Sequence, residues 1–283
     1  MSRNGAHIHD VPTPIPGADP GAPIVRLEEV RKSFGALRVL DGVSLSIKTG
    51  ENTVVLGPSG AGKSVLLKHI VGLLRPDSGA VLFRGVRVDD VPERHLTEVR
   101  RNIGFLFQMA ALFDSMNVEE NVAFPLVEHT DLNKQERRDR VAAALRTVEM
   151  DGSQKKLPAE LSGGQRKRVG LARAVILKPA LVLYDEPTTG LDPIRADGIN
   201  DLILKMRDSL GLTGVIVTHD LASARKIADR VVVLYEGKIV ADGTFEQVER
   251  SEHPYVQRFM SGTYHPDARP QQPHARATPQ EPL

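Results

Sequence analysis

One run of eight residues constrains the fold of this chain more than any other stretch, because it fits the pattern G-x-x-x-x-G-K-[ST] and follows the apolar run 53–56. Its members are Gly57, Pro58, Ser59, Gly60, Ala61, Gly62, Lys63 and Ser64. Glycines let the backbone curl so that N–H groups point at phosphate oxygens, while Lys63 can reach the outer phosphates and Ser64 can hold Mg²⁺. The pattern predicts a nucleotide-binding loop, followed by a helix from near Gly62 to about Leu74, rather than an ordinary glycine-rich turn.

The composition limits the other function classes. Lysine and arginine number 37 against 36 acids, so the chain lacks the global basic charge typical of nonspecific nucleic-acid binding, and we expect no nucleic-acid partner. Without cysteine there can be no disulfide framework, thiolate zinc site or thiol redox chemistry, which is compatible with a reducing cytoplasm. No stretch approaches the roughly 20 apolar residues of a membrane-spanning helix, and no signal-peptide pattern is present, so we expect any membrane role to be peripheral.

Proline-rich segments border the part of the chain that we expect to fold. Residues 1–23 and 265–283 are rich in proline and poor in large apolar side chains, so we expect a disordered lead and a disordered tail. Residues 253–260 are expected to form a short amphipathic helix within a C-terminal helical extension of residues 251–264. An ordinary capping helix explains this pattern equally well.

Short, uniformly apolar runs separated by helical patterns predict an α/β fold with a mainly parallel sheet covered on both faces. We expect helices near residues 193–210 and 221–229, and a helix-rich insert over 118–178 that includes the run 133–148. The expected strands are residues 24–30, 39–47, 53–56, 81–83, 103–107, 180–184, 215–218 and 231–235, with a turn at 77–79 and a last hairpin strand at 238–241.

Two acidic residues follow a buried strand pattern at 181–184. Asp185 is expected at the carboxyl end of that strand, beside the phosphate loop of a neighbouring parallel strand, where it can bind Mg²⁺ directly or through water. Glu186 is placed one residue further on, where it can polarise an attacking water. The alternative is that both acids merely close a strand in a solvated turn, and the phosphate loop upstream disfavours it.

The pentapeptide Leu161–Gln165 precedes an amphipathic pattern that runs to about Lys178. Ser162 is a good helix N-cap, and Gly163 and Gly164 free the backbone for another anion contact. Alone, this segment could be a capped helix start. About a hundred residues after the phosphate loop and twenty before the acidic pair, it resembles the signature motif of ABC-type ATPases.

Other positions of that family can be matched one by one. Gln108 follows its strand where the family has a glutamine that senses Mg²⁺ and nucleotide, and Asp192 lies in a segment that resembles the D-loop. His219 resembles the switch histidine that contacts the γ-phosphate. Phe34 stands where the family stacks an aromatic residue, more commonly tyrosine, on adenine; a core phenylalanine is the alternative.

The resemblance covers about residues 24–250. It implies the P-loop ABC ATPase fold, with a mainly parallel sheet core, an antiparallel β subdomain and an inserted helical subdomain at about 109–178. It further implies that two copies face each other and trap two ATP molecules, each between the phosphate loop of one copy and a signature segment of the other. The signature positions are Ser162, Gly163, Gly164 and Gln165.

The resemblance also implies the roles of the site residues in ATP hydrolysis. Glu186 would act as general base or orient the attacking water, His219 would position it, and Lys63 would neutralise charge together with Mg²⁺. Gln108 would complete this catalytic set. The residues expected to hold Mg²⁺ are Ser64, Gln108 and Asp185.

The segment 108–126 resembles the ATPase subunits of Mla-type phospholipid transporters. That subgroup pairs with an integral membrane permease and an MCE-domain lipid-binding protein, and its C-terminal extension helps to bind the neighbouring ATPase or a small accessory protein. The resemblance thus implies a homodimer at the cytoplasmic side of the inner (plasma) membrane. If Leu112, Phe113 and Phe124 simply pack the helical insert, however, the cargo stays unspecified.

Two rival interpretations come from other classes. The same cassette chemistry could serve another importer, or a cell-division membrane complex in which the ATPase acts as a mechanical switch. A non-transport ABC protein acting on DNA or ribosomes is disfavoured, because such proteins typically carry two cassettes, zinc cysteines or long coiled coils. This chain has one cassette and no cysteine.

Overall fold

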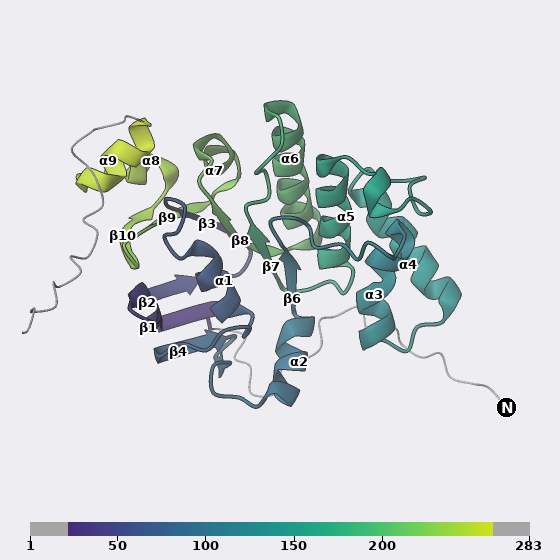
Figure 1. The fold of residues 1–283 in the computed structure, drawn as a ribbon, viewed down its shortest axis with the longest axis horizontal. Helices are drawn as coiled ribbons and strands as arrows, with labels where there is room; N and C mark the ends of the chain where they lie inside the picture. Colours follow the sequence, from purple (N-terminus) through teal and green to yellow (C-terminus); the bar gives the residue numbers. More distant parts are fainter. Residues whose placement is uncertain (1–21, 263–283) are drawn as a thin grey trace, which may run out of the picture.

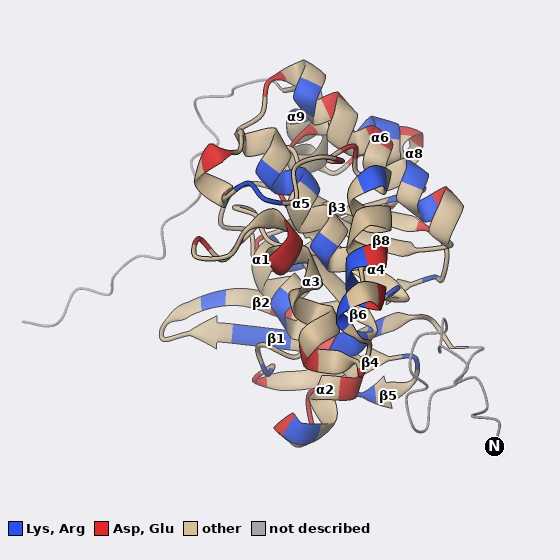
Figure 2. Ribbon diagram, turned by 90° about the vertical axis from the view of Figure 1, so that its right-hand side faces the viewer, with Lys and Arg blue, Asp and Glu red and all other residues tan. Residues whose placement is uncertain are grey.

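The computed structural model describes residues 22–262. Most of the expected lead and all of the expected tail therefore lie outside the described residues. Among residues 22–262, no helix is long and apolar enough to cross a bilayer. On the side of the molecule seen in Figure 2, lysine and arginine are interspersed with aspartate and glutamate along the helices and strands.

The centre of the fold is a six-stranded sheet of order β10-β9-β3-β8-β7-β6, in which only the edge strand β10 is antiparallel to its neighbour. Its strands are β3 (Asn52–Leu56), β6 (Ile103–Leu106), β7 (Leu181–Asp185), β8 (Thr213–Thr218), β9 (Arg230–Tyr235) and β10 (Lys238–Gly243). Every residue of β3, β7 and β8 is buried, and the polar residues of these strands lie at the strand ends, which leaves apolar centres. The expected mainly parallel core is thus confirmed.

Alternate residues of each central strand belong to two different hydrophobic layers. Val54 and Ile216, for example, pack with the side chains of α6 (Pro193–Leu210) and α7 (Leu221–Ile227). Val55 and Val217 pack in the other layer, with those of α1 (Lys63–Ile70) and α2 (Glu93–Arg101). This alternation is the period of two that a strand imposes on its side chains, and it shows that both faces of the sheet are covered.

A second, four-stranded antiparallel sheet of order β2-β1-β4-β5 completes the layer that contains α1. Its strands are β1 (Val25–Phe34), β2 (Leu37–Ile47), β4 (Ser78–Phe83) and β5 (Val86–Arg87). Figure 1 shows β1, β2 and β4 side by side, below the end of the parallel sheet. The antiparallel part implied by the family resemblance is therefore present.

The prediction of a turn at 77–79 is wrong, because Ser78 and Gly79 already belong to β4. The Asp77 carboxylate accepts a hydrogen bond from the Ser33 backbone N–H at 2.6 Å, which ties the start of β4 to β1. Gly79 has a φ of +93°, and a Cβ there would lie 2.4 Å from the carbonyl oxygen of Glu28. The glycine therefore marks a close approach between strands rather than a turn.

Three helices gather at the end of the molecule near β6: α3 (Val118–His129), α4 (Lys134–Thr147) and α5 (Gly163–Val175), with the short 3₁₀-helix η1 (Pro158–Glu160) before α5. Asn117 and Asn133 each cap a helix through a capping box, which fixes the starts of α3 and α4. At the opposite end, α8 (Phe245–Glu249) and α9 (Pro254–Ser261) lie beside β10 (Figure 1).

Three helices are shorter than expected, among them α7, which ends at Ile227 rather than near residue 229. The helix after the phosphate loop ends at Ile70 rather than near Leu74, because Gly72 adopts a left-handed φ of +69° that stops it. The helix α5 ends at Val175 rather than Lys178. The sequence pattern also missed α2, whose residues are mostly charged and which buries only Leu96 and Val99.

Candidate nucleotide-binding site

The register of the parallel strands brings three motifs to one edge of the sheet. Leu56, just before the phosphate loop, pairs with Thr218, which precedes His219. Asp185 pairs with Val217 on the other side of β8. The phosphate loop, the acidic pair and His219 therefore meet at the carboxyl ends of neighbouring strands, where α/β proteins place their ligands.

The phosphate loop connects β3 to α1 through glycines that larger residues could not replace. A Cβ on Gly57 would lie 2.3 Å from the carbonyl oxygen of Leu234 in β9. Gly62 has a φ of +97° and a Cβ there would come within 2.9 Å of Val39. Its carbonyl oxygen accepts the first α-helical hydrogen bond, from the Leu66 N–H at 2.8 Å. The loop therefore starts α1 directly, with the free N–H groups of the first turn at the site.

Lys63 is 6% exposed and lies in the middle of this loop. Its Nζ donates to the carbonyl oxygens of Gly57 at 2.8 Å and Pro58 at 3.1 Å, and it lies 3.6 Å from Oε1 of Glu186. Burial lowers the pKa of Lys63, and the Glu186 carboxylate partly opposes that shift. The Lys63 ammonium group is therefore within ion-pair distance of the Glu186 carboxylate.

The side chains of Ser64 and Asp185 are in contact. The Ser64 hydroxyl donates to Oδ1 of Asp185 at 2.8 Å, while burial raises the pKa of that carboxyl group. These two hard oxygen groups fit Mg²⁺, which is usually held by one or two carboxylates together with phosphates and water. No cluster of three His, Cys, Asp or Glu side chains suited to a metal is found within residues 22–262, so the phosphates would have to supply further ligands.

Glu186 is 8% exposed, has a positive φ of 50°, and is held through both carboxylate oxygens. The hydroxyls of Thr189 and Thr218 donate to its Oε2 at 2.9 and 3.3 Å. Nδ1 of His219 lies 3.0 Å from each of the two carboxylate oxygens. Oε1 accepts from neither threonine and lies 3.6 Å from Nζ of Lys63.

Lys63, Ser64, Glu186 and His219 line one cavity of about 510 Å³, within the usual size range of small-molecule sites, whereas Asp185 is not among its lining residues. Gln108 lies on its wall, as does Phe34, which is 47% exposed and therefore not a core residue. Lys32 Nζ lies 5.6 Å from the centre of the Phe34 ring. The lining residues are Phe34, Val39, Ser59, Gly60, Gly62, Lys63, Ser64, Val65, Gln108, Glu186, Thr189 and His219.

The signature segment and Asp192 do not line this cavity. Ser162 caps α5: its hydroxyl accepts from the Gln165 N–H at 3.3 Å, and Oε1 of Gln165 accepts from the Ser162 N–H at 2.9 Å. Asp192 caps α6 by accepting from the Arg195 N–H at 3.0 Å. Cβ atoms on Gly163 and Gly164 would come within 3.7 and 3.8 Å of Leu191, so the two segments adjoin each other.

Sequence reasoning missed Lys167, a residue of α5 that is only 5% exposed. Its Nζ donates to the backbone carbonyl oxygen of Glu186 at 2.8 Å. Burial lowers the pKa of Lys167 to about 8, although the Glu186 and Asp185 carboxylates oppose that shift. The sequence shows three consecutive cations at 166–168, and nothing in that pattern distinguishes the buried one.

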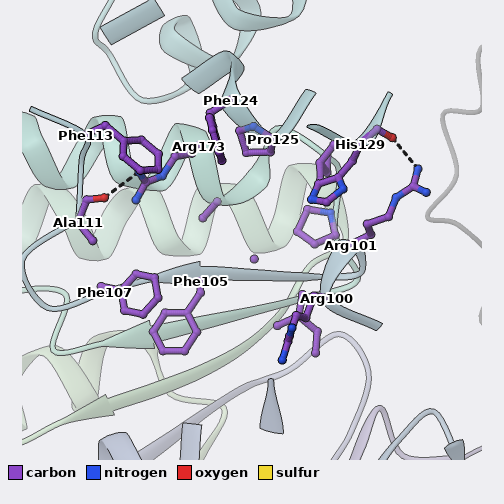
Figure 3. A pocket seen from close by; sticks show the side chains of 15 residues that line it. Arg100, Arg101, Phe105, Phe107, Ala111, Phe113, Phe124, Pro125, His129 and Arg173 are labelled. Carbon is purple, nitrogen blue, oxygen red and sulfur yellow. Dashed lines mark hydrogen bonds between the residues drawn. The ribbon is translucent and has the colours of Figure 1, made fainter. Parts of the chain in front are cut away.

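A second cavity, of about 310 Å³, opens between β6, α3 and α5 (Figure 3). Four phenylalanines line it; Phe113 and Phe124 lie 4.8 Å apart between ring centres, and Phe105 stacks on Phe107 at 4.1 Å. Arg173 of α5 lies beneath Phe113 and donates to the carbonyl oxygen of Ala111 at 2.8 Å. Phe113 and Phe124 therefore line a surface cavity, whereas Leu112 packs against the core as the alternative expected. We name this space the aromatic cavity.

Comparisons with known proteins agree with this geometry. A family model described as ABC transporter matches residues 40–189. The chain is 43% identical to the "Probable ribonucleotide transport ATP-binding protein mkl" of Mycobacterium leprae, over 87% of this chain and 71% of that protein. It is 39% identical to the "Intermembrane phospholipid transport system ATP-binding protein MlaF" of Escherichia coli, over 85% of this chain and 90% of that protein.

A solved structure shows the same fold. The dimeric post-hydrolysis state of the ATP-binding cassette MJ0796, bound to ADP and Pi, matches with a TM-score of 0.73 at 35% identity, over 78% of this chain and 98% of that one. The predicted fold and the predicted ATP binding are confirmed by these similarities. The chain therefore belongs to the ABC transporter family, as one of its ATP-binding, ATP-hydrolysing domains.

Proposed function

We propose that the chain acts as a homodimer that hydrolyses ATP between its two copies and powers phospholipid transport with a membrane permease and an MCE-domain protein. The observation that carries the dimer is the separation of the signature segment from the nucleotide cavity. Residues 162–165 and Asp192 lie outside the cavity that contains Lys63. A facing copy would supply them to the exposed phosphates, and the similar MJ0796 cassette is dimeric.

Lys63 binds the phosphates in this proposal. It now donates to two carbonyl oxygens of its own loop, which are neutral acceptors. Phosphate oxygens are charged acceptors and form stronger hydrogen bonds with an ammonium group. We therefore infer that ATP draws Lys63 away from Gly57 and Pro58, and that the new contacts offset the cost of burying the cation.

Glu186 orients the attacking water and accepts its proton. Thr189 and Thr218 donate to one carboxylate oxygen, which leaves the other available to accept from water, and His219 lies 3.0 Å from both oxygens. His219 then contacts the γ-phosphate and keeps water and phosphate in line. Ser64, Asp185 and Gln108 would hold Mg²⁺, which would neutralise charge on the outer phosphates. Phe34 stacks on the adenine at the open end of the cavity.

The aromatic cavity is the proposed binding site for a helix of the permease. Phe113 is 41% exposed there, which leaves an aromatic surface for a partner, while Arg100 and Arg101 on the rim pair with Glu93 and Glu98 of the same chain. Gln108 lies five residues before Phe113, so a helix seated in the aromatic cavity can move the segment that reaches the nucleotide. This contact would hold the chain at the cytoplasmic side of the inner membrane.

We assign the ATPase domain to residues 24–250, with its helical insert at about 109–178, and a C-terminal extension to residues 251–264. Within the extension, Tyr255 of α9 stacks on Tyr235 of β9 at 3.7 Å between ring centres, which fixes α9 to the sheet. Phe259 packs on Tyr255 at 5.8 Å. The outer face of α9 is the proposed contact for a neighbouring ATPase or a small accessory protein.

The names of the two relatives refer to two different transported substrates. Phospholipid is the cargo that we favour, because the chain spans 90% of the E. coli phospholipid protein and the segment 108–126 resembles that subgroup. The M. leprae relative, named for ribonucleotide transport, supports another importer as the second candidate. Both candidates use the same ATP chemistry, so only the membrane partners and the cargo distinguish them.

Purification of the full chain from its own membranes in mild detergent tests the cargo. We expect a permease and an MCE-domain protein to co-purify, and we expect phospholipid, but not ribonucleotides, to change the ATPase rate of the reconstituted complex. Stimulation by ribonucleotides alone would establish the second candidate. Recovery with a cell-division complex, and no MCE-domain protein, would contradict a role in transport.

A further inference from the structure

The side chain of Lys167 crosses from the interior of α5 to the backbone of Glu186. Lys167 lies four residues after Gly163, about one helical turn into α5. Its residue surface is 5% exposed, and its Nζ donates to the Glu186 carbonyl oxygen at 2.8 Å. A buried side chain of the signature helix is thus bonded directly to the residue that we expect to activate water.

Burying the Lys167 ammonium group would cost free energy without a benefit if this side chain only packed the core. An ammonium group can donate three hydrogen bonds, and desolvation of the charge is large enough to lower the pKa of Lys167 to about 8. A methionine would fill a similar volume without burying a charge. The presence of a lysine at this position therefore points to a role for its hydrogen bond.

The backbone of Glu186 needs such support. Its φ is +50°, in the left-handed region that residues other than glycine rarely adopt. The N–H of Glu186 donates to the carbonyl oxygen of Val217 at 3.0 Å, which fixes one side of the residue. Lys167 fixes the other side through the carbonyl group. Together they determine where the Glu186 side chain leaves the backbone.

We propose that Lys167 is a positioning residue for ATP hydrolysis: it holds the Glu186 peptide in its left-handed conformation and ties the alignment of the carboxylate to the position of α5. The proposal rests on the role of Glu186 in the proposed function. Because α5 begins at the signature segment, docking of that segment on the ATP of a second copy would be transmitted through Lys167 to Glu186 of the same chain.

Replacement of Lys167 by methionine tests the hydrogen bond while keeping the apolar volume. We expect kcat to fall roughly 10- to 100-fold, as small misplacements of a catalytic group do, with the Kd for ATP within about threefold of the unchanged chain. The midpoint of urea unfolding at pH 7.5 should change little, because removal of a desolvated cation offsets the loss of the hydrogen bond to the Glu186 carbonyl group. The matched control is Arg168→Met on the same helix.

Arg168 donates to the Val148 carbonyl oxygen and to Glu149, away from Glu186, so its replacement should change kcat less than about twofold. Equal losses of kcat in Lys167→Met and Arg168→Met would show that any damage to α5 has this effect, and would overturn the proposal. So would a normal kcat in Lys167→Met, or a loss explained by a lower unfolding midpoint.

A double-substitution cycle isolates the path through Glu186. Residual hydrolysis of radiolabelled ATP is measured for Glu186→Gln alone and for Glu186→Gln with Lys167→Met. If Lys167 acts through Glu186, the second substitution should lower the residual rate by less than about twofold. A further loss equal to that in the unchanged background would overturn the proposal. A near-normal rate in Glu186→Gln alone would instead contradict the proposed role of Glu186.

Discussion

The nucleotide cavity and the aromatic cavity lie on either side of the segment that starts at Gln108, and they are built in opposite ways. The first gathers charged and hydroxyl groups, such as Lys63, Glu186 and Thr189, near the carboxyl ends of parallel strands. The second gathers four phenylalanines and cationic side chains between β6 and the helices α3 and α5. The first suits phosphate chemistry and the second suits contact with another protein, so one chain can join hydrolysis to a partner's movement.

Glu186→Gln should have the largest effect on the nucleotide cavity. The amide cannot accept the proton of the attacking water, so we expect kcat to fall roughly 1,000-fold. The phosphate loop is untouched, and the Kd for ATP should change less than about threefold. Steady-state hydrolysis and a nucleotide-binding titration check the two expectations, and near-normal turnover would remove Glu186 from the mechanism.

Lys63→Ala should act on binding instead. The substitution removes the cation that is expected to contact the outer phosphates, and it leaves the Glu186 carboxylate without its opposite charge at 3.6 Å. We expect ATP affinity to fall about 100-fold or more. Titration with a fluorescent ATP analogue measures the effect, and an unchanged Kd would contradict the assignment.

Phe113→Asp changes the aromatic cavity and should affect binding to the permease without affecting ATP hydrolysis in the nucleotide cavity. A carboxylate in place of the Phe113 ring should weaken the proposed permease contact at least about 10-fold, because the aromatic contact is lost and a charged group must be desolvated when the partner binds. The ATPase rate of the isolated chain should stay within about twofold. Leu210→Asp, at an exposed leucine at the end of α6, is the matched control.

Co-purification with the permease and ATPase assays of the chain alone give the two readouts for Phe113→Asp. If the isolated chain loses its own ATPase activity while Leu210→Asp does not, the two cavities are not separate in function. If Phe113→Asp still binds the permease as tightly as the unchanged chain, the permease does not bind in the aromatic cavity.

Phe34→Ala should have the smallest effect. Removing one stacking surface at the rim of the cavity should raise KM for ATP about fivefold and leave kcat almost unchanged. Phe34→Tyr should restore the affinity, because the ring is retained. Equal KM values for the alanine variant and the unchanged chain would show that adenine binds without Phe34.

Much of the nucleotide cavity was predictable because its parts lie in short motifs at the ends of buried strands. Parallel strands bring their carboxyl ends to the same edge, so Ser64 and Asp185 had to approach each other once both strands were recognised. The contact of Lys167 with Glu186 depends instead on the rotation of α5 over the sheet. No local sequence pattern determines that rotation. Because arginines stand on both sides of Lys167, the sequence does not show which of the three cations is buried.

The errors in the predicted secondary structure also arise because contacts between distant parts of the chain cannot be read from a local pattern. Residues 77–79 have turn composition, yet long-range pairing with β1 places Ser78 and Gly79 in a strand. The helix α2 is so highly charged that its short buried stripe, Leu96 and Val99, gave no clear period. In both cases tertiary contacts decided between local alternatives that the sequence left open.

The central claim is that a second copy completes the ATP site, and the mass of the Glu186→Gln chain in solution tests it most directly. Multi-angle light scattering is measured with and without saturating Mg²⁺-ATP, and again with Gly163→Asp added, which places a carboxylate where a phosphate should dock. We predict the mass of two chains only with ATP, and the mass of one chain when Gly163→Asp is present. A single-chain mass for Glu186→Gln with ATP demonstrably bound would contradict the account.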